Sequence, residues 1–338
     1  MLGPLSQRLL VLLQFTRMAL VFTAVSNGWA ALLLRVAYEA GERPLGQVFN
    51  PFTAIAMAGV SVGLYAFGMT LNDIIDRRRD TVISAERPLP SGRLGLQTAH
   101  VLCGLLATVA FAFGAWLAGL LRVGDASLVL VVGTLTLIVF YNLAGKYLVA
   151  AGLLTLGLIR FFHAAVPAPM LPLVWHPLFL LVHTSVLSTV CYYLEQKRPA
   201  LSRRAVAGVA TGLAVFVGLI LFASATRHLE AGAPTLATAL SLDGRLLIPL
   251  SAGVIFLGLA VLIRQRTADA RAAGKRIMLV GLLWLIVYDV AFVGVYVSTL
   301  AAGALLLLLP LAYMSVQVMR GWAKAVELTR PPEFQRAR

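Results

Sequence analysis

The sequence predicts an all-α membrane protein, a polytopic helical bundle with nine or ten transmembrane helices. Three observations predict this fold class: 60% of the 338 residues are hydrophobic, only 12% are charged, and the mean hydropathy is +0.88. Soluble domains carry about a quarter charged residues, so the composition excludes a soluble globular enzyme and a disordered protein. Cys103 and Cys191 lie inside apolar runs without a neighbouring cysteine, which favours packing over metal or disulfide chemistry.

Segments of about 20 apolar residues, the length that crosses a bilayer, recur along the whole chain. No polar stretch is long enough for a soluble domain, so residues 1–338 are expected to form a single membrane domain. Arg17 interrupts the apolar N-terminus and no cleavage site follows, which predicts a retained first helix rather than a signal peptide. The last two segments lie so close together that nine spans with a re-entrant or amphipathic end also fit. The ten predicted spans are 14–37, 51–71, 98–121, 126–144, 148–168, 177–194, 205–226, 246–263, 277–298 and 301–319.

The net charge of +14 predicts the orientation of these spans. With a cytoplasmic N-terminus and one crossing per span, 22 of the 28 Lys and Arg residues fall inside and 5 outside, with Arg160 within a span. Cytoplasmic loops of membrane proteins carry such an excess, so both termini are expected in the cytoplasm. The basic loops lack the interleaved aromatic residues of nucleic-acid binders, and topology and anionic lipid explain them without a nucleic-acid partner.

The most informative segment follows the second span, where three of the 14 acidic residues fall within nine positions. At about 100° per residue, the side chains of Asn72, Asp73, Asp76 and Asp80 share an arc of about 100° on one helical face. Three carboxylates on one face repel one another unless a cation lies among them. Oxygen ligands of this kind suit Mg²⁺, which binds a few carboxylates together with substrate phosphates. The alternative is a solvated charge run at a helix end.

The pattern Asn72-Asp73-x-x-Asp76-x-x-x-Asp80 resembles the first aspartate-rich motif of the UbiA superfamily of intramembrane prenyltransferases. The stretch Arg87-Pro88-Leu89-Pro90-Ser91-Gly92 is similar to the loop that follows that motif. The resemblance implies a helical bundle around a central cavity. It also implies an allylic diphosphate held by Mg²⁺, and transfer of its prenyl group to a lipophilic, often aromatic, acceptor.

The second aspartate-rich motif of the family, which follows the sixth span, is reduced in this chain. The corresponding place holds one acid, Glu195, and two cations, Lys197 and Arg198. Either Glu195 alone holds a weaker second metal, or the two cations take over part of the neutralisation of the diphosphate. A third reading is that the chain has drifted from prenyl transfer. The reduced motif indicates a divergent branch of the superfamily, of which the EboC-type proteins are one example.

Three further residues resemble family positions that contact the diphosphate. Tyr141 and Lys146, after the fourth span, resemble a Tyr-x-x-x-Lys element with one extra residue, and Arg17 lies where family members carry an arginine. The alternatives are an aromatic-belt tyrosine and basic side chains that only extend to the membrane interface.

Four residues within the predicted spans are unusual for a bilayer environment. Charges in a span are costly and mostly functional, so Arg160 is expected to line a polar cavity wall. His163, three residues later, more often serves as a satisfied core histidine. Asp289 either pairs with an arginine, acts on the acceptor or lies in a small water pocket, and Asn27 is a candidate cavity contact.

Two hypotheses follow. The first is a Mg²⁺-dependent prenyltransferase of a bacterial inner membrane. Its catalytic residues are Asp73, Asp76, Asp80 and Glu195, which together with Asn72 bind the metal. Its substrate-binding residues are Asn72, Arg17, Tyr141, Lys146, Arg160, Lys197 and Arg198. The second hypothesis is a non-catalytic isoprenoid or lipid carrier or transporter, for which Asp289 and Arg160 are the ionisable residues that transport needs within the membrane.

Overall fold

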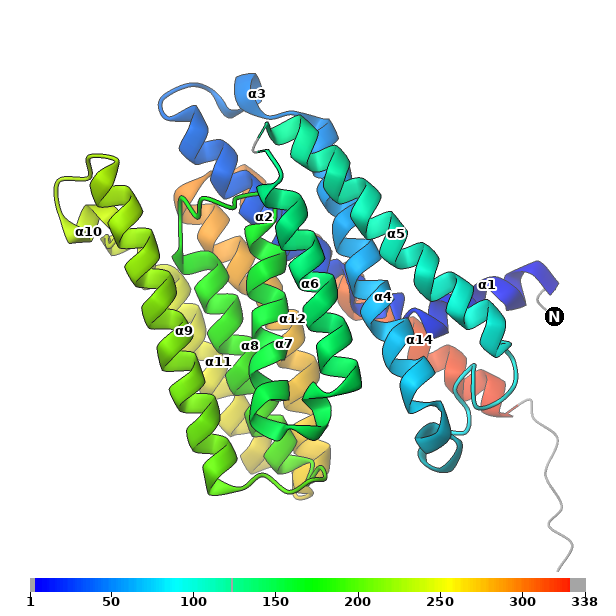
Figure 1. Ribbon diagram of the computed structural model, residues 1–338. Helices are drawn as coiled ribbons and strands as arrows, with labels where there is room; N and C mark the ends of the chain where they lie inside the picture. The colour runs from blue at the N-terminus through cyan, green and yellow to red at the C-terminus, as the bar shows by residue number, and fades with distance from the viewer. Residues whose placement is uncertain (1–3, 123, 329–338) are drawn as a thin grey trace, which may run out of the picture.

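The computed structural model describes residues 4–122 and 124–328, and within these ranges the chain forms helices and no strand (Figure 1). Apolar runs of this length satisfy every backbone group internally only as helices, which explains the fold class. The α-helices are α1 (Pro4–Phe15), α2 (Val21–Ala40), α3 (Leu45–Val48), α4 (Pro51–Ile83), α5 (Leu96–Leu121), α6 (Ala126–Leu143), α7 (Val149–Ala165), α8 (Trp175–Leu194), α9 (Arg203–Glu230), α10 (Leu236–Ala239), α11 (Leu247–Arg266), α12 (Ala270–Tyr296), α13 (Thr299–Leu306) and α14 (Leu308–Leu328). The short 3₁₀ turns are η1 (Met18–Leu20), η2 (Gly145–Tyr147) and η3 (Gly244–Leu246).

Nine helical segments of the described chain are long and apolar enough to cross a membrane, and α7 is a shorter apolar helix of 17 residues. The chain is a multi-pass membrane protein of the predicted fold class. The first span is shorter than predicted, because Arg17 adopts a left-handed conformation (φ 50°) and separates α1 from the helix that begins at Val21. The last predicted span is interrupted at Leu307, between α13 and α14.

Six helices form a closed ring, in which α2, α4, α6, α7, α8 and α12 pack each against the next and α12 returns to α2. The remaining long helices lie outside this ring: α5 on α4 and α6, α9 on α7, α11 on α12, and α14 on α2 and α12 (Figure 1). The ring helices are more buried than the outer ones. In the most apolar 18-residue segment of each helix, 72% is buried in α2 and only 6% in α9. The ring therefore encloses the interior of the protein, and α9 presents its surface to lipid.

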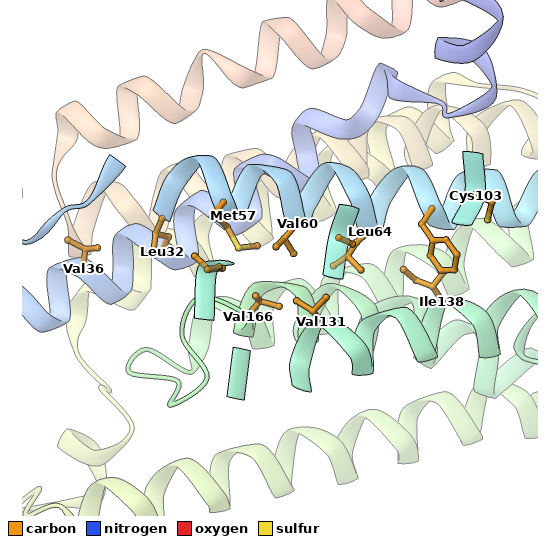
Figure 2. Packing of buried hydrophobic residues seen from close by; sticks show 13 residues of the cluster. Leu32, Val36, Met57, Val60, Leu64, Cys103, Val131, Ile138 and Val166 are labelled. Carbon is orange, nitrogen blue, oxygen red and sulfur yellow. The ribbon is translucent and has the colours of Figure 1, made fainter. Parts of the chain in front are cut away.

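Small residues set the spacing between α4 and its neighbours. A side-chain carbon added to Gly63 would lie 2.7 Å from the backbone nitrogen of Ala110, so α4 and α5 approach more closely there than any larger residue permits. Figure 2 shows the core beside this contact, where Met57, Val60 and Leu64 of α4 lie among side chains of α2, α5 and α6. Cys103 belongs to this core, and both cysteines are buried and unpaired, as their apolar surroundings predict.

The loop between α4 and α5 is fixed at one end of the bundle by the N-terminal helix. Phe15 of α1 is fully buried and packs with Leu89 and Leu94 of that loop and with Ala99 of α5. The turns after α6 and α8 lie at this same end, whereas α3 and α10 lie at the opposite end (Figure 1). Segments far apart in the sequence, 15–17, 84–95 and 144–148, therefore converge on the last turns of α4.

Candidate active site

The last turns of α4 carry three buried carboxylates. Asp73, Asp76 and Asp80 are 4%, 6% and 1% exposed, whereas Arg78 and Arg79 are exposed. Asn72 is partly buried beside them. The whole acidic segment is helical because α4 continues without a break from its Asn50 cap to Ile83. The structure thus places the three aspartates on one helical face, as their spacing predicts.

Basic side chains from three parts of the chain neutralise this acidic face. A guanidinium nitrogen of Arg17 lies 2.5 Å from Asp73 Oδ1, and Lys146 Nζ lies 2.6 Å from Asp76 Oδ1. Arg79, one turn away on α4, donates to Asp76 Oδ2 at 2.8 Å. Lys146 can reach Asp76 because it lies in η2, the turn that follows α6. Arg17 can reach Asp73 because the chain turns at this residue, between α1 and η1. These side chains supply the cations that three neighbouring carboxylates require.

Arg87, which sequence reasoning did not assign to the site, connects two of the aspartates. Its Nη1 lies 2.5 Å from Asp80 Oδ2 and 3.6 Å from Asp73 Oδ1. Leu89, buried against Phe15, fixes the loop that carries Arg87. The signal that could have identified it was in the sequence, because Arg87 begins the Arg-Pro-Leu-Pro-Ser-Gly stretch seven residues after Asp80.

At the end of α8, Glu195 pairs with Lys197 rather than with the acidic face. Glu195 Oε2 lies 3.3 Å from Lys197 Nζ, and its carboxylate is largely shielded, with 16% of the side chain exposed. Arg198 and Lys197 are exposed. Gly274 of α12 makes room for Glu195, because a side-chain carbon there would lie 2.9 Å from Glu195 Cγ. Among the described residues, none of the cations that pair with the three aspartates also pairs with Glu195.

Comparison with known proteins relates this arrangement to one family. Residues 28–171 match the sequence profile of the UbiA prenyltransferase family, a range that contains α4 and its acidic face. The matched range is less than half of the 338 residues, and over this part the chain is similar to the UbiA prenyltransferase family.

Two solved structures resemble this chain in the fold as a whole. A structure described as a digeranylgeranylglyceryl phosphate synthase in membranes is 15% identical, with a TM-score of 0.60, over 86% of this chain and 99% of that chain. The ligand-free UbiA homologue from Aeropyrum pernix K1 is 18% identical, with a TM-score of 0.50, over 79% of this chain and 97% of that chain. A comparison with curated protein sequences finds no match.

The acidic face of α4 has the donor chemistry for a metal ion whose coordination a bound ligand completes. Asp80 Oδ1 is buried and receives no hydrogen bond, which is the environment of an oxygen available to a cation. The described residues contain no group of three or more His, Cys, Asp or Glu side chains that could hold a metal by themselves. Mg²⁺ binds through one or two carboxylates together with substrate phosphates, so the residues fit a Mg²⁺–diphosphate complex better than a metal alone.

Tyr141 lies in the last turn of α6 and interacts electrostatically with Asp76, Arg79 and Tyr192 of α8. It therefore stands between the acidic face and the end of α8 that carries the reduced second motif.

Deeper in the ring, a polar network connects four helices. Asp289 of α12 is fully buried and accepts hydrogen bonds from Ser26 Oγ at 2.6 Å and Asn27 Nδ2 at 2.7 Å, both on α2, and lies 2.8 Å from His176 Nε2 on α8. Arg160 of α7 donates to Asn27 Oδ1 at 3.1 Å and Thr23 Oγ1 at 3.3 Å. Asp289 thus pairs with a histidine and reaches Arg160 only through Asn27. Its carboxylate is fully enclosed by Ser26, Asn27 and His176.

Two further interior residues, His163 and Tyr65, make hydrogen bonds between helices or to the turn at Arg17. His163 is buried on α7, and its Nε2 lies 2.9 Å from Ser61 Oγ on α4. Its buried Nδ1 has no hydrogen-bond partner among the described residues, so the expected satisfied core histidine is satisfied at one ring nitrogen only. Tyr65, one helical turn after Ser61, donates to the backbone oxygen of Arg17 at 3.1 Å. Tyr65 thus contacts the residue that pairs with Asp73.

Proposed function

We propose that this chain transfers the prenyl group of an allylic polyprenyl diphosphate to a lipophilic, in particular an aromatic, acceptor within the membrane, with Mg²⁺ as cofactor. The observation that carries the proposal is the acidic face of α4. Three buried carboxylates and four cations, Arg17, Arg79, Arg87 and Lys146, meet there at one end of a membrane bundle. A diphosphate and a divalent cation match such a mixed set of charges, because each finds partners of the opposite sign.

The proposed reaction breaks the bond between the allylic carbon and the diphosphate oxygen, and the diphosphate leaves with the electron pair. The acceptor then forms a bond to the allylic carbon and loses a proton. Groups that stabilise the developing negative charge provide most of the catalysis in such reactions. Arg17, Arg87 and Lys146 can serve the departing oxygens, while the apolar ring excludes the water that would capture the allylic cation.

The metal would be held by Asp73, Asp76 and Asp80, with Asn72 at the edge of the site and Glu195 as a partial second ligand. Bound there, Mg²⁺ would neutralise charge on the diphosphate. Tyr141 and Arg160 complete the substrate-binding set. Lys197 and Arg198, at the exposed turn after α8, are assigned to the entry of the diphosphate.

The test is pyrophosphate release by the purified full-length protein with radiolabelled geranyl, farnesyl and geranylgeranyl diphosphates and Mg²⁺. We expect release with at least one donor and its loss in Asp76→Ala. Glu42→Gln is the matched control, because Glu42 is an exposed carboxylate in the loop between α2 and α3, and α3 lies at the opposite end of the bundle (Figure 1). Release that is absent with every donor, or equal in Asp76→Ala and the parent protein, would contradict the proposal.

The carrier or transporter alternative needs an ionisable group that loads and unloads within the membrane. Asp289 is the acid that this role would use. Its carboxylate is fully buried and already has three hydrogen-bonding partners, Ser26, Asn27 and His176. The enzyme proposal is therefore the better supported one. We place the acidic face and both termini in the cytoplasm of a bacterial cell, because the loops on the predicted cytoplasmic side carry the excess of Lys and Arg.

A further inference from the structure

Two polar side chains meet on the outer side of the ring, where α11 packs on α12. The ring centres of His183 on α8 and Tyr288 on α12 lie 5.1 Å apart in an edge-to-face contact. Phe256 of α11 packs on His183 at 4.7 Å, and Phe179 of α8 packs on Tyr288 at 5.7 Å. Only 8% of His183 and 4% of Tyr288 are exposed, so aromatic and apolar groups enclose most of both rings. Neither residue belongs to the acidic face or to the hydrogen-bond network of Asp289.

Both residues lie well inside the membrane-spanning part of their helices. His183 is eight residues from Trp175, where α8 begins, and Tyr288 is eight residues from Tyr296, where α12 ends. Eight residues correspond to about 12 Å of helical rise, whereas the hydrocarbon core of a bilayer is about 30 Å thick. A polar atom at this depth has no bulk water to bind, and leaving it without a hydrogen bond costs free energy.

The hydrogen bond of His183 determines which of its ring nitrogens can accept another one. Its Nε2 lies 2.9 Å from the backbone oxygen of Gly281 on α12, and a carbonyl oxygen only accepts. Nε2 therefore carries the proton, and in the neutral ring Nδ1 is an acceptor. No group in the described part of the chain donates a hydrogen bond to Nδ1.

The Tyr288 hydroxyl likewise makes no hydrogen bond to any residue that the structure describes. The hydroxyl lies next to Gly253 of α11, because a side-chain carbon added to that glycine would lie 3.4 Å from the hydroxyl oxygen. Gly253 is partly exposed, and Val254 beside it is 69% exposed on the outer surface of α11. Among the described residues, the fully enclosed polar atoms without a partner include neither this oxygen nor His183 Nδ1. Both atoms are therefore accessible to a small ligand, and Gly253 leaves the hydroxyl open toward lipid.

The two atoms differ in the hydrogen bond that each offers. Tyr288 has an O–H donor, whereas His183 Nδ1 is an acceptor. A carbonyl or ether oxygen satisfies only Tyr288, because it has no hydrogen to donate. A hydroxyl group has both an acceptor oxygen and a hydrogen to donate. Because the ring centres of the two residues are only 5.1 Å apart, one small ligand can contact both rings.

We propose that Tyr288 and His183 form a lateral binding site for a membrane-soluble alcohol, which enters from lipid beside Gly253. The hydroxyl of the alcohol accepts from Tyr288 and donates to His183 Nδ1, and its apolar body lies against Phe256 and the outer surface of α11. Binding sites for small molecules commonly combine an apolar lining with a few polar groups that orient the ligand. The inference goes beyond the proposed function and does not rest on it, because none of these residues is assigned to the diphosphate or the metal.

The experiment photolabels the full-length protein in detergent with azioctanol, an octanol that carries a photoreactive diazirine. Neither diphosphate nor Mg²⁺ is added, so the result does not depend on prenyl transfer. Mass spectrometry locates the label, and labelling of α11 and α12 is expressed relative to that of α9, which presents its surface to lipid. We expect octanol to displace the label from α11 and α12 at a concentration about tenfold lower than octyl methyl ether, which has no hydrogen to donate.

Two variants with matched controls test the site. Tyr288→Phe keeps the ring, removes only the hydroxyl and should lower the relative labelling about tenfold, whereas Tyr313→Phe, at an exposed tyrosine of α14, should leave it unchanged. Gly253→Val fills the space beside the Tyr288 hydroxyl and should exclude the probe. Gly258→Val, also on α11, should not, because an added carbon there meets nothing within 4 Å.

The inference would be overturned by relative labelling that is the same in the parent protein and in a folded Tyr288→Phe or Gly253→Val variant. The probe would then lie in the surrounding detergent or lipid without a site. Equal displacement by octanol and octyl methyl ether would also overturn it, since a hydroxyl would gain nothing from His183. If no donor releases pyrophosphate but the labelling depends on Tyr288, the proposed function fails and the alcohol site remains.

Discussion

Lys146 Nζ lies 2.6 Å from Asp76 Oδ1, although the two residues are 70 positions apart in the chain. The pair joins the acidic end of α4 to the turn between α6 and α7 and closes one side of the candidate site. Only 11% of the Lys146 side chain and 6% of the Asp76 side chain are exposed. Because the pair is shielded from water, its partners interact more strongly than a surface pair does.

Lys146→Gln should therefore weaken binding of the prenyl diphosphate. Hydrogen bonds to charged groups contribute about 1.5–3 kcal/mol, which corresponds to a rise in KM of about tenfold to a hundredfold. The KM for the donor is measured from steady-state pyrophosphate release at varied donor concentration. Lys275→Gln is the control, because Lys275 is an exposed lysine near the start of α12. An unchanged KM in Lys146→Gln would remove Lys146 from the site.

Glu195→Gln should raise the Mg²⁺ concentration that gives half-maximal activity. If Glu195 is the remaining ligand of a second metal, its loss removes a negative oxygen, and several times more Mg²⁺ is needed for the same rate. Gly274→Ala should shift the Mg²⁺ dependence in the same direction, because the added carbon would lie 2.9 Å from Glu195 Cγ. The readout is a Mg²⁺ titration of pyrophosphate release, with Glu230→Gln at an exposed position as control. A titration curve that superimposes on that of the parent protein would leave Glu195 without a metal role.

The fold was largely predictable because runs of about 20 apolar residues identify the membrane-spanning helices directly from the sequence. Every predicted span has a helix in the structure, but the ends of the first and last spans depend on local backbone geometry. Arg17 stands out in the sequence as the charge that interrupts the apolar N-terminus, but neither its left-handed conformation nor the interruption at Leu307 can be inferred from composition.

The candidate site was predictable where its residues lie on one helix. Asp73, Asp76 and Asp80 follow helical spacing, so their common face could be inferred from the sequence. The partners of these aspartates depend on which distant loops meet at that end of the bundle. Sequence reasoning named Arg17 and Lys146 through a family resemblance, but did not connect Arg87 to Asp80 or His176 to Asp289.

Gly63→Val should destabilise the protein through the contact between α4 and α5. Helices in membranes associate largely by close packing at small residues, and the added side chain would collide with the backbone of Ala110. We expect a clear fall in the melting temperature in detergent. Gly104→Val is the matched control on α5, since a side-chain carbon at Gly104 has nothing within 4 Å. Equal melting temperatures for the two variants would show that the close approach at Gly63 adds no stability.

Asp289→Leu should destabilise the protein more than any other single change at an acidic position. Asp289 is 0% exposed and has Ser26, Asn27 and His176 as partners, all of which the substitution leaves buried. Removing one partner of a buried charged pair costs about 3–5 kcal/mol. The loss should appear as a lower melting temperature in detergent and as faster proteolysis. Asp125→Leu is the control, because Asp125 is exposed and makes no capping hydrogen bond at the start of α6. If Asp289→Leu melts at the temperature of the control, the network around Asp289 does not hold α2, α8 and α12 together.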